Sequence, residues 1–351
     1  MSETPAPGRL LVCALAGPEL LRHEEEALRE LAPAGVILFA RNLKSPAQVR
    51  DLVAGIRECC PLPAFVSIDQ EGGTVNRLTA LDGAFFRLPP ARVQAAWPAE
   101  RLRATWRAVG EALRALGIDV AFAPVVDLDD GDGRNAIGPR SFGTDPDRVA
   151  GCGREVLAGL AAAGVAGCAK HFPGLGGTDL DTHRALAESP LSAEELWERH
   201  VLPYRALREA TPLVMTAHAW YPAVDPGDPL PGTFSRTLLS GWLRERIGYD
   251  GVVITDDLGM GAVAGRGTPG ELAETALRAG ADLALFCRDV DDPRRARDHL
   301  AGRLEAGALE PGPLREKARH LEALLARPGI GEHPRPLAAW EIALVTFRET
   351  C

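Results

Sequence analysis

The stretch from Lys170 to His183, KHFPGLGGTDLDTH, gathers the side chains that proton transfer and sugar binding require. Lys170 and His171 follow the apolar, small-residue run 164–169, so we expect them at the carboxyl end of a buried strand. The glycines that come next free the backbone to move, and Asp181 and His183 follow them. An imidazole with a pKa of about 6.5 can give or accept a proton near neutral pH, and a neighbouring carboxylate can orient the ring. The stretch therefore predicts an acid–base pair on a movable loop beside a fixed strand end.

Other carboxylates also come at the ends of apolar runs. Asp69 follows one run, and the pair Asp256–Asp257 closes another. Taken singly, Asp69 is typical of a turn and the pair is typical of a helix cap. Together with the acid–base pair they supply what cleavage of a glycosidic bond needs: one group that attacks the anomeric carbon and another that protonates the departing oxygen. We predict Asp256 for the first role, and His183 supported by Asp181 for the second.

The whole chain alternates short apolar, β-rich runs with longer stretches rich in alanine, arginine and glutamate, a pattern typical of repeated βα units. The predicted strands are residues 10–14, 36–39, 64–68, 119–123, 165–169, 213–216, 251–255 and 282–286. The predicted helices include residues 46–59, 100–116, 146–163, 192–209, 235–246 and 269–279. Good N-terminal signals are Ser45 before Pro46, Ser192 with Glu195 in a capping box, and Thr268 before Pro269.

Strands that are apolar on both faces favour an α/β fold with a closed parallel barrel of the (β/α)8 TIM type, and a doubly wound open sheet is the alternative. We expect a single domain over residues 1–351, with a barrel core at about 9–305 and a C-terminal helical tail over 306–351. In such barrels the chemistry lies at the carboxyl ends of the strands. The polar residues described above would then share one rim.

The composition excludes several classes of protein. Hydrophobic residues make up 46% and charged residues 25%, as in ordinary soluble globular proteins. A net charge of -9 offers no basic surface for nucleic acid, and we find neither a membrane-spanning run nor a basic leader before an apolar segment. Seven cysteines without a CxxC pair fit reduced thiols. We therefore expect a cytoplasmic monomer with no cofactor or metal, which binds a small molecule rather than nucleic acid or a membrane.

Six motifs, in this order, resemble glycoside hydrolase family 3, specifically its single-domain bacterial β-N-acetylglucosaminidases of cell-wall recycling. They are GVILFARN (35–42), SIDQEGGTVNRL (67–78), FAPVVDL (122–128), IGPRSFGTDP (137–146), KHFPGLGGTDLDTH (170–183) and GVVITDDLGMGAV (251–263). The resemblance implies a retaining exo-acting enzyme that releases terminal N-acetylglucosamine from muropeptides through a covalent glycosyl-aspartate. It implies that Asp256 is the nucleophile, His183 the general acid/base and Asp181 its support. It also implies that the sugar is bound by Asp69, Arg77, Arg140, Lys170 and His171.

Two features depart from the family pattern. Leu175 stands where the family usually has a histidine, so a polar contact is lost from the loop. The segment 127–135, DLDDGDGRN, is more acidic than in the family. Because it lacks the spacing and the terminal glutamate of a calcium loop, we interpret it as a solvated loop.

The residues leave other functions open. The motifs do not define an acetamido pocket, so a family 3 β-glucosidase is an alternative, as is a phosphorylase in which phosphate replaces water. His171, His183, His218 and Asp256 could instead bind the metal of a barrel hydrolase, although the first strand offers no HxH pair. A catalytically silent sugar-binding protein is the third alternative.

Overall fold

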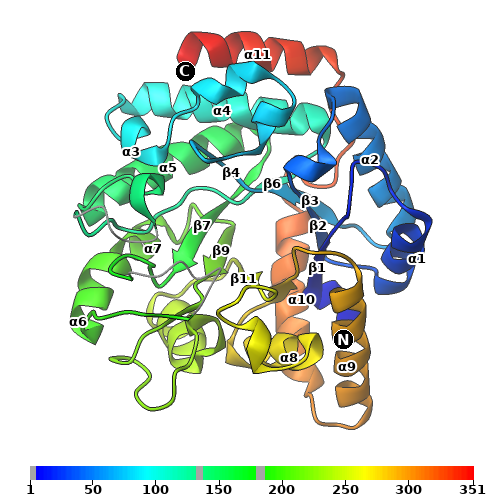
Figure 1. Ribbon diagram of the computed structural model, residues 1–351, viewed down its shortest axis with the longest axis vertical. Helices are drawn as coiled ribbons and strands as arrows, with labels where there is room; N and C mark the ends of the chain where they lie inside the picture. The colour runs from blue at the N-terminus through cyan, green and yellow to red at the C-terminus, as the bar shows by residue number, and fades with distance from the viewer. Residues whose placement is uncertain (1–4, 132–136, 179–185) are drawn as a thin grey trace.

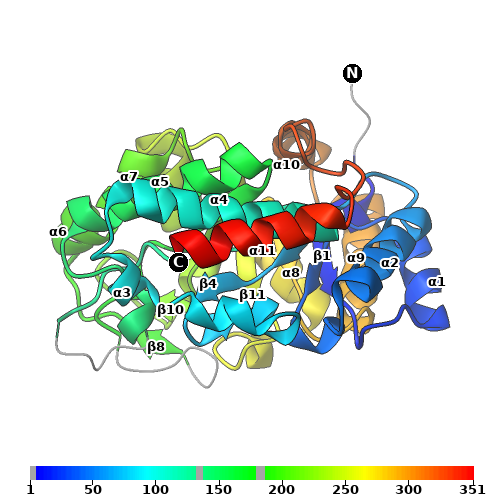
Figure 2. The same ribbon diagram turned by 90° about the horizontal axis from the view of Figure 1, so that it is seen from above.

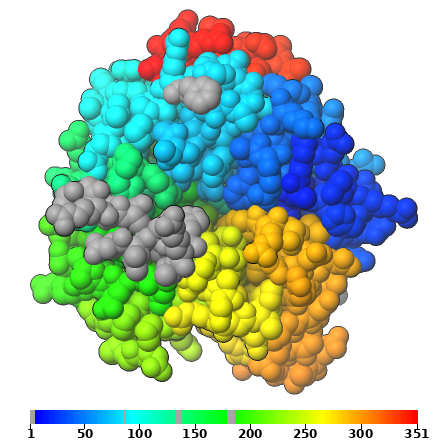
Figure 3. Space-filling view, in the orientation of Figure 1, coloured from blue at the N-terminus to red at the C-terminus, as the bar shows by residue number. Residues whose placement is uncertain are grey.

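The computed structural model describes residues 5–131, 137–178 and 186–351. In this part of the chain, eight parallel strands close into a barrel, which confirms the predicted fold (Figure 1). They are β1 (Leu11–Ala14), β2 (Gly35–Leu38), β3 (Phe65–Ile68), β6 (Val120–Ala121), β7 (Ala166–Phe172), β9 (Leu213–Thr216), β11 (Val252–Asp257) and β12 (Leu283–Leu285). Strand β1 pairs with both β2 and β12, so the open sheet is wrong. In Figure 3 the blue N-terminal segments accordingly lie beside the orange segments of the last βα unit.

The side chains of the strands pack in two layers. One layer fills the barrel interior and includes Val12, Phe65 and Met215, whereas the other lies between the strands and the surrounding helices and includes Val36 and Val253. Both faces of every strand are therefore covered. This explains why the strands appear in the sequence as continuous apolar runs rather than as an alternating pattern.

Helices surround the barrel between its strands. The longer ones are α1 (Arg22–Leu31), α2 (Pro46–Cys59), α4 (Ala99–Leu116), α5 (Pro146–Ala163), α8 (Pro269–Ala279) and α9 (Asp291–Glu305). The bounds predicted for 46–59, 146–163 and 269–279 are confirmed. Ser45 Oγ accepts a hydrogen bond from the Gln48 N–H, and Thr268 forms a reciprocal capping box with Glu271.

The single helix predicted over 192–209 is wrong. Ser192 does cap α6 (Ala193–Glu195), but a π-helical turn, η6 (Leu196–His200), then separates α6 from α7 (Leu202–Leu207). The Val201 N–H donates to the Leu196 carbonyl, five residues back, at 2.9 Å. Pro203, which has no N–H, follows directly, and the wider turn accommodates this missing donor. The helix predicted over 235–246 is likewise π-helical, as η8 (Thr237–Arg246).

Shorter elements lie at the barrel ends. Strand β4 (Gln70–Gly72) pairs with β5 (Val75–Asn76), and β8 (Ala187–Glu188) pairs with β10 (Ala219–Trp220). The remaining short helices in the described ranges are the α-helix α3 (Ala91–Gln94) and the 3-10 helices η1 (Pro7–Leu10), η2 (Ala40–Asn42), η3 (Arg77–Ala80), η4 (Gly83–Arg87), η5 (Gly138–Arg140), η7 (Gly232–Phe234) and η9 (Ala264–Arg266). They matter for the site because η3, η5 and the β4–β5 hairpin carry several of its side chains.

The tail beyond α9 contains two helices, as predicted, namely α10 (Pro311–Leu325) and α11 (Ala338–Thr350). Leu321 and Leu324 of α10 join the apolar cluster of the barrel interior, so α10 covers the amino-terminal end of the barrel. Helix α11 packs along α4 (Figure 2). None of the helices in the described ranges is long and apolar enough to cross a membrane.

Candidate active site

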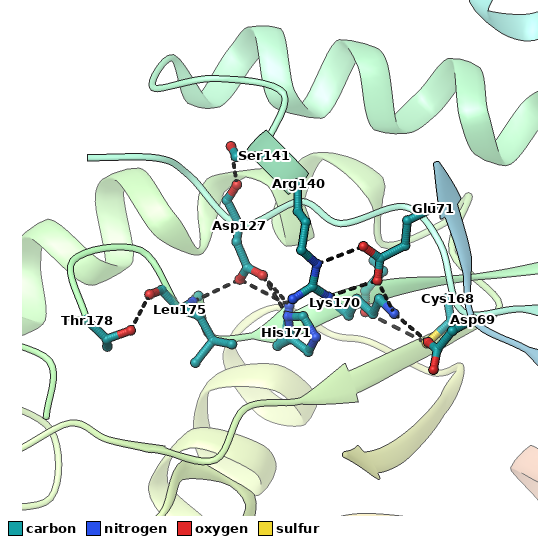
Figure 4. Close-up of polar contacts among 12 residues, drawn as sticks. Asp69, Glu71, Asp127, Arg140, Ser141, Cys168, Lys170, His171, Leu175 and Thr178 are labelled. Carbon is teal, nitrogen blue, oxygen red and sulfur yellow. Dashed lines mark hydrogen bonds and ion pairs between the residues drawn. The ribbon is translucent and has the colours of Figure 1, made fainter. Parts of the chain in front are cut away.

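Four charged side chains meet at the carboxyl end of the barrel (Figure 4). Lys170, in β7, places its Nζ 2.7 Å from Asp69 Oδ1 and 2.7 Å from Glu71 Oε1. Arg140, the last residue of η5, donates from Nε and Nη2 to the two Glu71 carboxylate oxygens, each at 2.8 Å. Asp69 directly follows β3 and Glu71 lies in β4. The fold thus brings together three of the predicted sugar-binding residues, Asp69, Arg140 and Lys170, around a glutamate.

The charges of this cluster hold one another in the ionised form. Burial alone would raise the pKa of the Glu71 carboxyl, but the charges of Lys170 and Arg140 outweigh it and hold that pKa far below its usual range. Burial would lower the pKa of the Lys170 ammonium, and the carboxylates of Asp69 and Glu71 raise it instead. Lys170 and Glu71 are therefore charged at neutral pH. The donors that the ion pairs leave unused suit the hydroxyl oxygens of a sugar.

A second buried carboxylate, Asp127, orients His171. The Nδ1 of His171 lies 2.7 Å from Asp127 Oδ2, and the carboxylate also accepts the backbone N–H groups of His171 and Leu175 at 3.1 and 2.9 Å. Since a carboxylate oxygen accepts hydrogen bonds, His171 Nδ1 donates this one, and no described residue bonds to its Nε2.

The solvated loop predicted over 127–135 is wrong for its first residues. Asp127 is 0% and Asp129 2% exposed, and Asp129 is paired with Arg92. Hydrogen bonds and an ion pair compensate for the burial of the two carboxylates. The composition of the segment does not reveal these partners. Residues 132–136 lie outside the described part of the chain.

Asp256 stands near the end of β11 and is half-buried. Its Oδ1 accepts the Asp257 N–H at 2.8 Å, and no described residue bonds to its Oδ2. Burial would raise the pKa of the Asp256 carboxyl, but the nearby His171 and His218 outweigh it, so the net effect lowers the pKa. An ionised carboxylate with one fixed and one free oxygen is suited to attack an electrophilic carbon.

Asp257 has a different environment. Its Oδ1 accepts the N–H groups of Gly259 at 2.9 Å and Cys287 at 3.1 Å, and its carbonyl accepts the His218 Nε2–H at 3.0 Å. Burial raises the pKa of the Asp257 carboxyl. Such contacts brace the chain after β11 and leave Asp256 as the freer carboxylate.

The predicted residues not yet accounted for are Asp181, His183 and Arg77. Asp181 and His183 lie outside the described residues. Arg77, in η3, has its guanidinium 5.9 Å from the centroid of the Phe39 ring, and its buried Nε has no hydrogen-bond partner in the described ranges. No contact among the described residues links Arg77 to Asp69, its predicted companion on the sugar.

The loop that begins after β7 is closely packed at its start. Gly174 and Gly177 have φ of 134° and 81°, values that favour glycine. A Cβ on Gly176 would lie 2.3 Å from the Leu128 carbonyl oxygen, so no side chain fits there. Leu175 is 4% exposed, and its apolar side chain therefore suits the position where the family usually has a histidine.

The metal-site alternative receives no support from the residues that the structure describes. Within residues 5–131, 137–178 and 186–351, no three His, Cys, Asp or Glu side chains are arranged as ligands of one ion. Of the residues named for that alternative, His171 is paired with Asp127, and His218 donates to the Asp257 carbonyl. Each of these contacts occupies one nitrogen of its ring.

Sequence reasoning missed Glu71 and Asp127 as site residues. Glu71 belongs to the SIDQEGGTVNRL motif, and Asp127 ends the apolar run FAPVV. Each is an acid placed just after a buried strand in a motif that already carries other site residues. That position was the available signal, because the carboxyl ends of barrel strands gather at one rim.

Comparison with known proteins decides the family. The profile of the glycosyl hydrolase family 3 N terminal domain matches residues 10–324. The chain belongs to glycosyl hydrolase family 3. The resemblance to this family drawn from the six motifs is thereby confirmed.

Relatives of this family 3 chain include a β-hexosaminidase from Thiobacillus denitrificans, which is 38% identical over 343 residues, or 92% of this chain and 94% of the relative. A β-hexosaminidase from Pseudomonas aeruginosa is 40% identical over 283 residues, or 80% of this chain and 82% of the relative. Among solved structures, a family 3 β-N-acetylglucosaminidase from Paenibacillus sp. str. FPU-7 matches with a TM-score of 0.87 and 37% identity. That match covers 93% of this chain but only 62% of the Paenibacillus chain.

Proposed function

We propose that this family 3 chain is a retaining exo-β-N-acetylglucosaminidase that acts in the cytoplasm, as a monomer, on muropeptides derived from peptidoglycan. The observation that carries the proposal is the state of Asp256, an ionised carboxylate at the rim with its Oδ1 held by a backbone N–H. The β-hexosaminidase and β-N-acetylglucosaminidase names of the relatives support the choice of sugar.

The proposed reaction has two steps. Asp256 Oδ2 attacks C1 of the sugar while the bond from C1 to the leaving oxygen breaks, and His183 gives its proton to that oxygen. Water then attacks C1 of the glycosyl-aspartate, His183 accepts a proton from the water, and Asp256 leaves as a carboxylate. Asp181 orients the His183 ring and stabilises its charged form. Configuration at C1 is inverted twice and is therefore retained.

The sugar is held by the charged cluster at the rim. Asp69 accepts hydrogen bonds from sugar hydroxyls, while Lys170 and Arg140 donate the N–H groups that Glu71 and Asp69 leave free. His171, fixed by Asp127, offers its Nε2. Arg77 is the fifth binding residue and acts from η3.

The test is turnover of a chromogenic β-N-acetylglucosaminide. Asp256→Asn should lower kcat by about 10³-fold or more, because it removes the nucleophile without changing its size. Asp257→Asn is the matched control and should lose much less. Undiminished turnover by Asp256→Asn, or equal losses in the two variants, would refute the assignment.

Two further measurements separate the alternatives. A β-glucoside should be turned over much more slowly than the N-acetylglucosaminide, and equal rates would favour a β-glucosidase. In phosphate buffer the product should be free N-acetylglucosamine, whereas a sugar phosphate would reveal a phosphorylase. His183→Ala should slow substrates with poor leaving groups more than those with good ones, since a good leaving group needs little protonation.

A further inference from the structure

A cavity of about 990 Å³ lies at the end of the barrel opposite the catalytic rim. Its walls come from the end of η8, the end of α8, the segment that joins α9 to α10, and α10 itself. Figure 2 shows α10 at the edge of the molecule away from β8 and β10, which lie on the rim side. The catalytic machinery therefore makes no use of this cavity.

Lys317, on α10, lines the cavity and is only 8% exposed. The sequence has just three lysines, Lys44, Lys170 and Lys317. Lys170 is held by two carboxylates, but no hydrogen bond or ion pair joins Lys317 to any residue that the structure describes. Burial lowers the pKa of the Lys317 ammonium, although Asp282 partly opposes this. The side chain of Lys317 is nine-tenths buried and its ammonium has no partner among the described residues, so a charge of opposite sign in the cavity would stabilise it.

The carboxylate with the largest effect on the Lys317 pKa, Asp282, already has hydrogen-bond partners. It is 1% exposed, and its Oδ2 accepts from Arg244 Nη2 at 2.5 Å and from the Val253 N–H at 2.7 Å. Its Oδ1 accepts from His320 Nδ1 at 2.9 Å. Arg244 Nη1 in turn donates hydrogen bonds to the carbonyl oxygens of Tyr249 and Gly251. Asp282 thus bonds to Arg244, His320 and the backbone, and no described carboxylate forms an ion pair with the Lys317 ammonium.

The charge inside the cavity favours an anion. Three charged groups of the lining are buried or half-buried, namely the cations Arg244 and Lys317 and the anion Asp282. With a neutral His320, these groups carry a net charge of one positive unit. The other charged residues of the lining are exposed, so water and salt screen them; they are Glu245, Asp250, Glu310, Glu316, Arg236 and Arg278. His320 lies one turn along α10 from Lys317 and lines the same cavity, with its Nε2 unused by the described residues.

We propose that this cavity binds a small oxyanion, such as hydrogen phosphate or a carboxylate, on the Lys317 ammonium. The anion pairs with the Lys317 ammonium, and when the ligand is hydrogen phosphate its O–H also donates to His320 Nε2. The site is separate from the sugar site and does not depend on the proposed glycosidase activity.

The experiment measures thermal unfolding of the full chain in sodium phosphate and in sodium chloride of equal ionic strength, for the wild type, Lys317→Met and Lys44→Met. Met keeps the apolar stem of lysine and removes its charge, and Lys44 is exposed. Phosphate at about ten times its dissociation constant should raise the midpoint by about 2 °C in the wild type and in Lys44→Met but not in Lys317→Met. In chloride, Lys317→Met should be at least as stable as the wild type, because it loses an unpaired buried charge.

Calorimetric titration of the wild type with phosphate provides a second measurement if Lys317→Met fails to fold. One bound phosphate that is displaced by acetate would support a general oxyanion site. No binding to the wild type, or an equal phosphate shift in Lys317→Met, would overturn the proposal, since phosphate held by Lys170 and Arg140 at the rim would give the latter result. Turnover of the chromogenic substrate by each variant reports separately on the catalytic end.

Discussion

Arg140 donates two parallel hydrogen bonds of 2.8 Å to the Glu71 carboxylate. This bidentate contact determines which N–H groups of Arg140 are left to bind a sugar. The bonds use Nε and one N–H of Nη2, so neither N–H group of Nη1 is used by the residues that the structure describes. The same Glu71 carboxylate holds Lys170 Nζ at 2.7 Å. One buried acid therefore orients two of the proposed sugar-binding cations.

Replacement of Glu71 should weaken sugar binding through these cations. Glu71→Gln retains the size of the side chain but replaces one carboxylate oxygen with an NH2 group. That group is a donor, whereas both N–H groups of Arg140 at this contact need acceptors. We expect kcat/KM for the N-acetylglucosaminide to fall about 100-fold, or about 2.7 kcal/mol of transition-state stabilisation. Steady-state kinetics of the purified variant provide the measurement.

A double-mutant cycle tests whether Glu71 acts through Arg140. Arg140→Met should cost nearly as much as Glu71→Gln, and the double variant should cost little more than either alone. Glu274→Gln is the control, because Glu274 is a carboxylate paired with Arg303 and Arg278 away from the rim. Additive losses in the cycle, or an equal loss in the control, would show that the bidentate contact does not position Arg140.

His200 should make the fold sensitive to mild acid. It is 6% exposed and lies against Gly174, its Nδ1 has no partner, and burial lowers its pKa to about 4. An unfolded histidine titrates near 6.5, so between these values the unfolded state binds more protons and stability rises with pH. The stability supplied by neutral His200 is thus complete above about pH 6.5 and is lost as the pH falls toward 4, on the order of 3 kcal/mol in all.

Urea unfolding at pH 7, 5.5 and 4.5 provides the check. The wild type should lose stability steadily over this series, whereas His200→Gln should lose much less. His23→Gln, at an exposed histidine, should behave as the wild type does. A parallel decline in wild type and His200→Gln would assign the acid sensitivity to other groups.

Asp119 should be important for stability and not for catalysis. It lies just before β6, at the end of the barrel away from the rim, and is 0% exposed. Its carboxylate accepts from Arg57 at 3.0 Å, Arg114 at 3.2 Å and the Gly331 N–H at 3.0 Å. Asp119→Ala leaves Arg114, itself 2% exposed, without its buried partner, so we expect a loss of about 3–5 kcal/mol in the free energy of unfolding.

Urea unfolding measures this loss, and KM at a temperature where the variant is folded should stay at the wild-type value. Asp145→Ala, which removes only the N-cap of α5, is the control and should cost about 1 kcal/mol. A changed KM in Asp119→Ala would indicate that the two ends of the barrel are coupled.

The strands and helices of the barrel were predictable because short segments of the sequence carry the signals for them. Strands such as 213–216 are covered on both faces and therefore carry uninterrupted apolar residues, and the helix over 46–59 has its cap and its N1 proline in the sequence. The interruption of 192–209 by a π-helical turn was not predictable, because Pro203 within a helical pattern is compatible with a kink, a break or a wider turn. Only packing against the barrel selects among these.

The sequence allowed us to predict which residues belong to the site, but not most of the contacts that these residues make. Asp69, Lys170 and Asp256 occupy strand ends, and this position made them candidates. The burial of Asp127 was not foreseeable, because DLDDGDG has the composition of a solvated loop and the partners of its carboxylate, His171 and Leu175, come more than forty residues later. The choice between Asp256 and Asp257 likewise depends on backbone N–H groups that no sequence pattern locates.

The central claim is that Asp256 forms a covalent bond to the sugar, and trapping this intermediate tests it most directly. The enzyme would be treated with a fluorinated N-acetylglucosaminyl substrate that reacts quickly in the first step and slowly in the second, then digested and analysed by mass spectrometry. We predict one added glycosyl group, located on Asp256. A label on Asp257 or on another residue, or an inverted product with no label at all, would contradict the account.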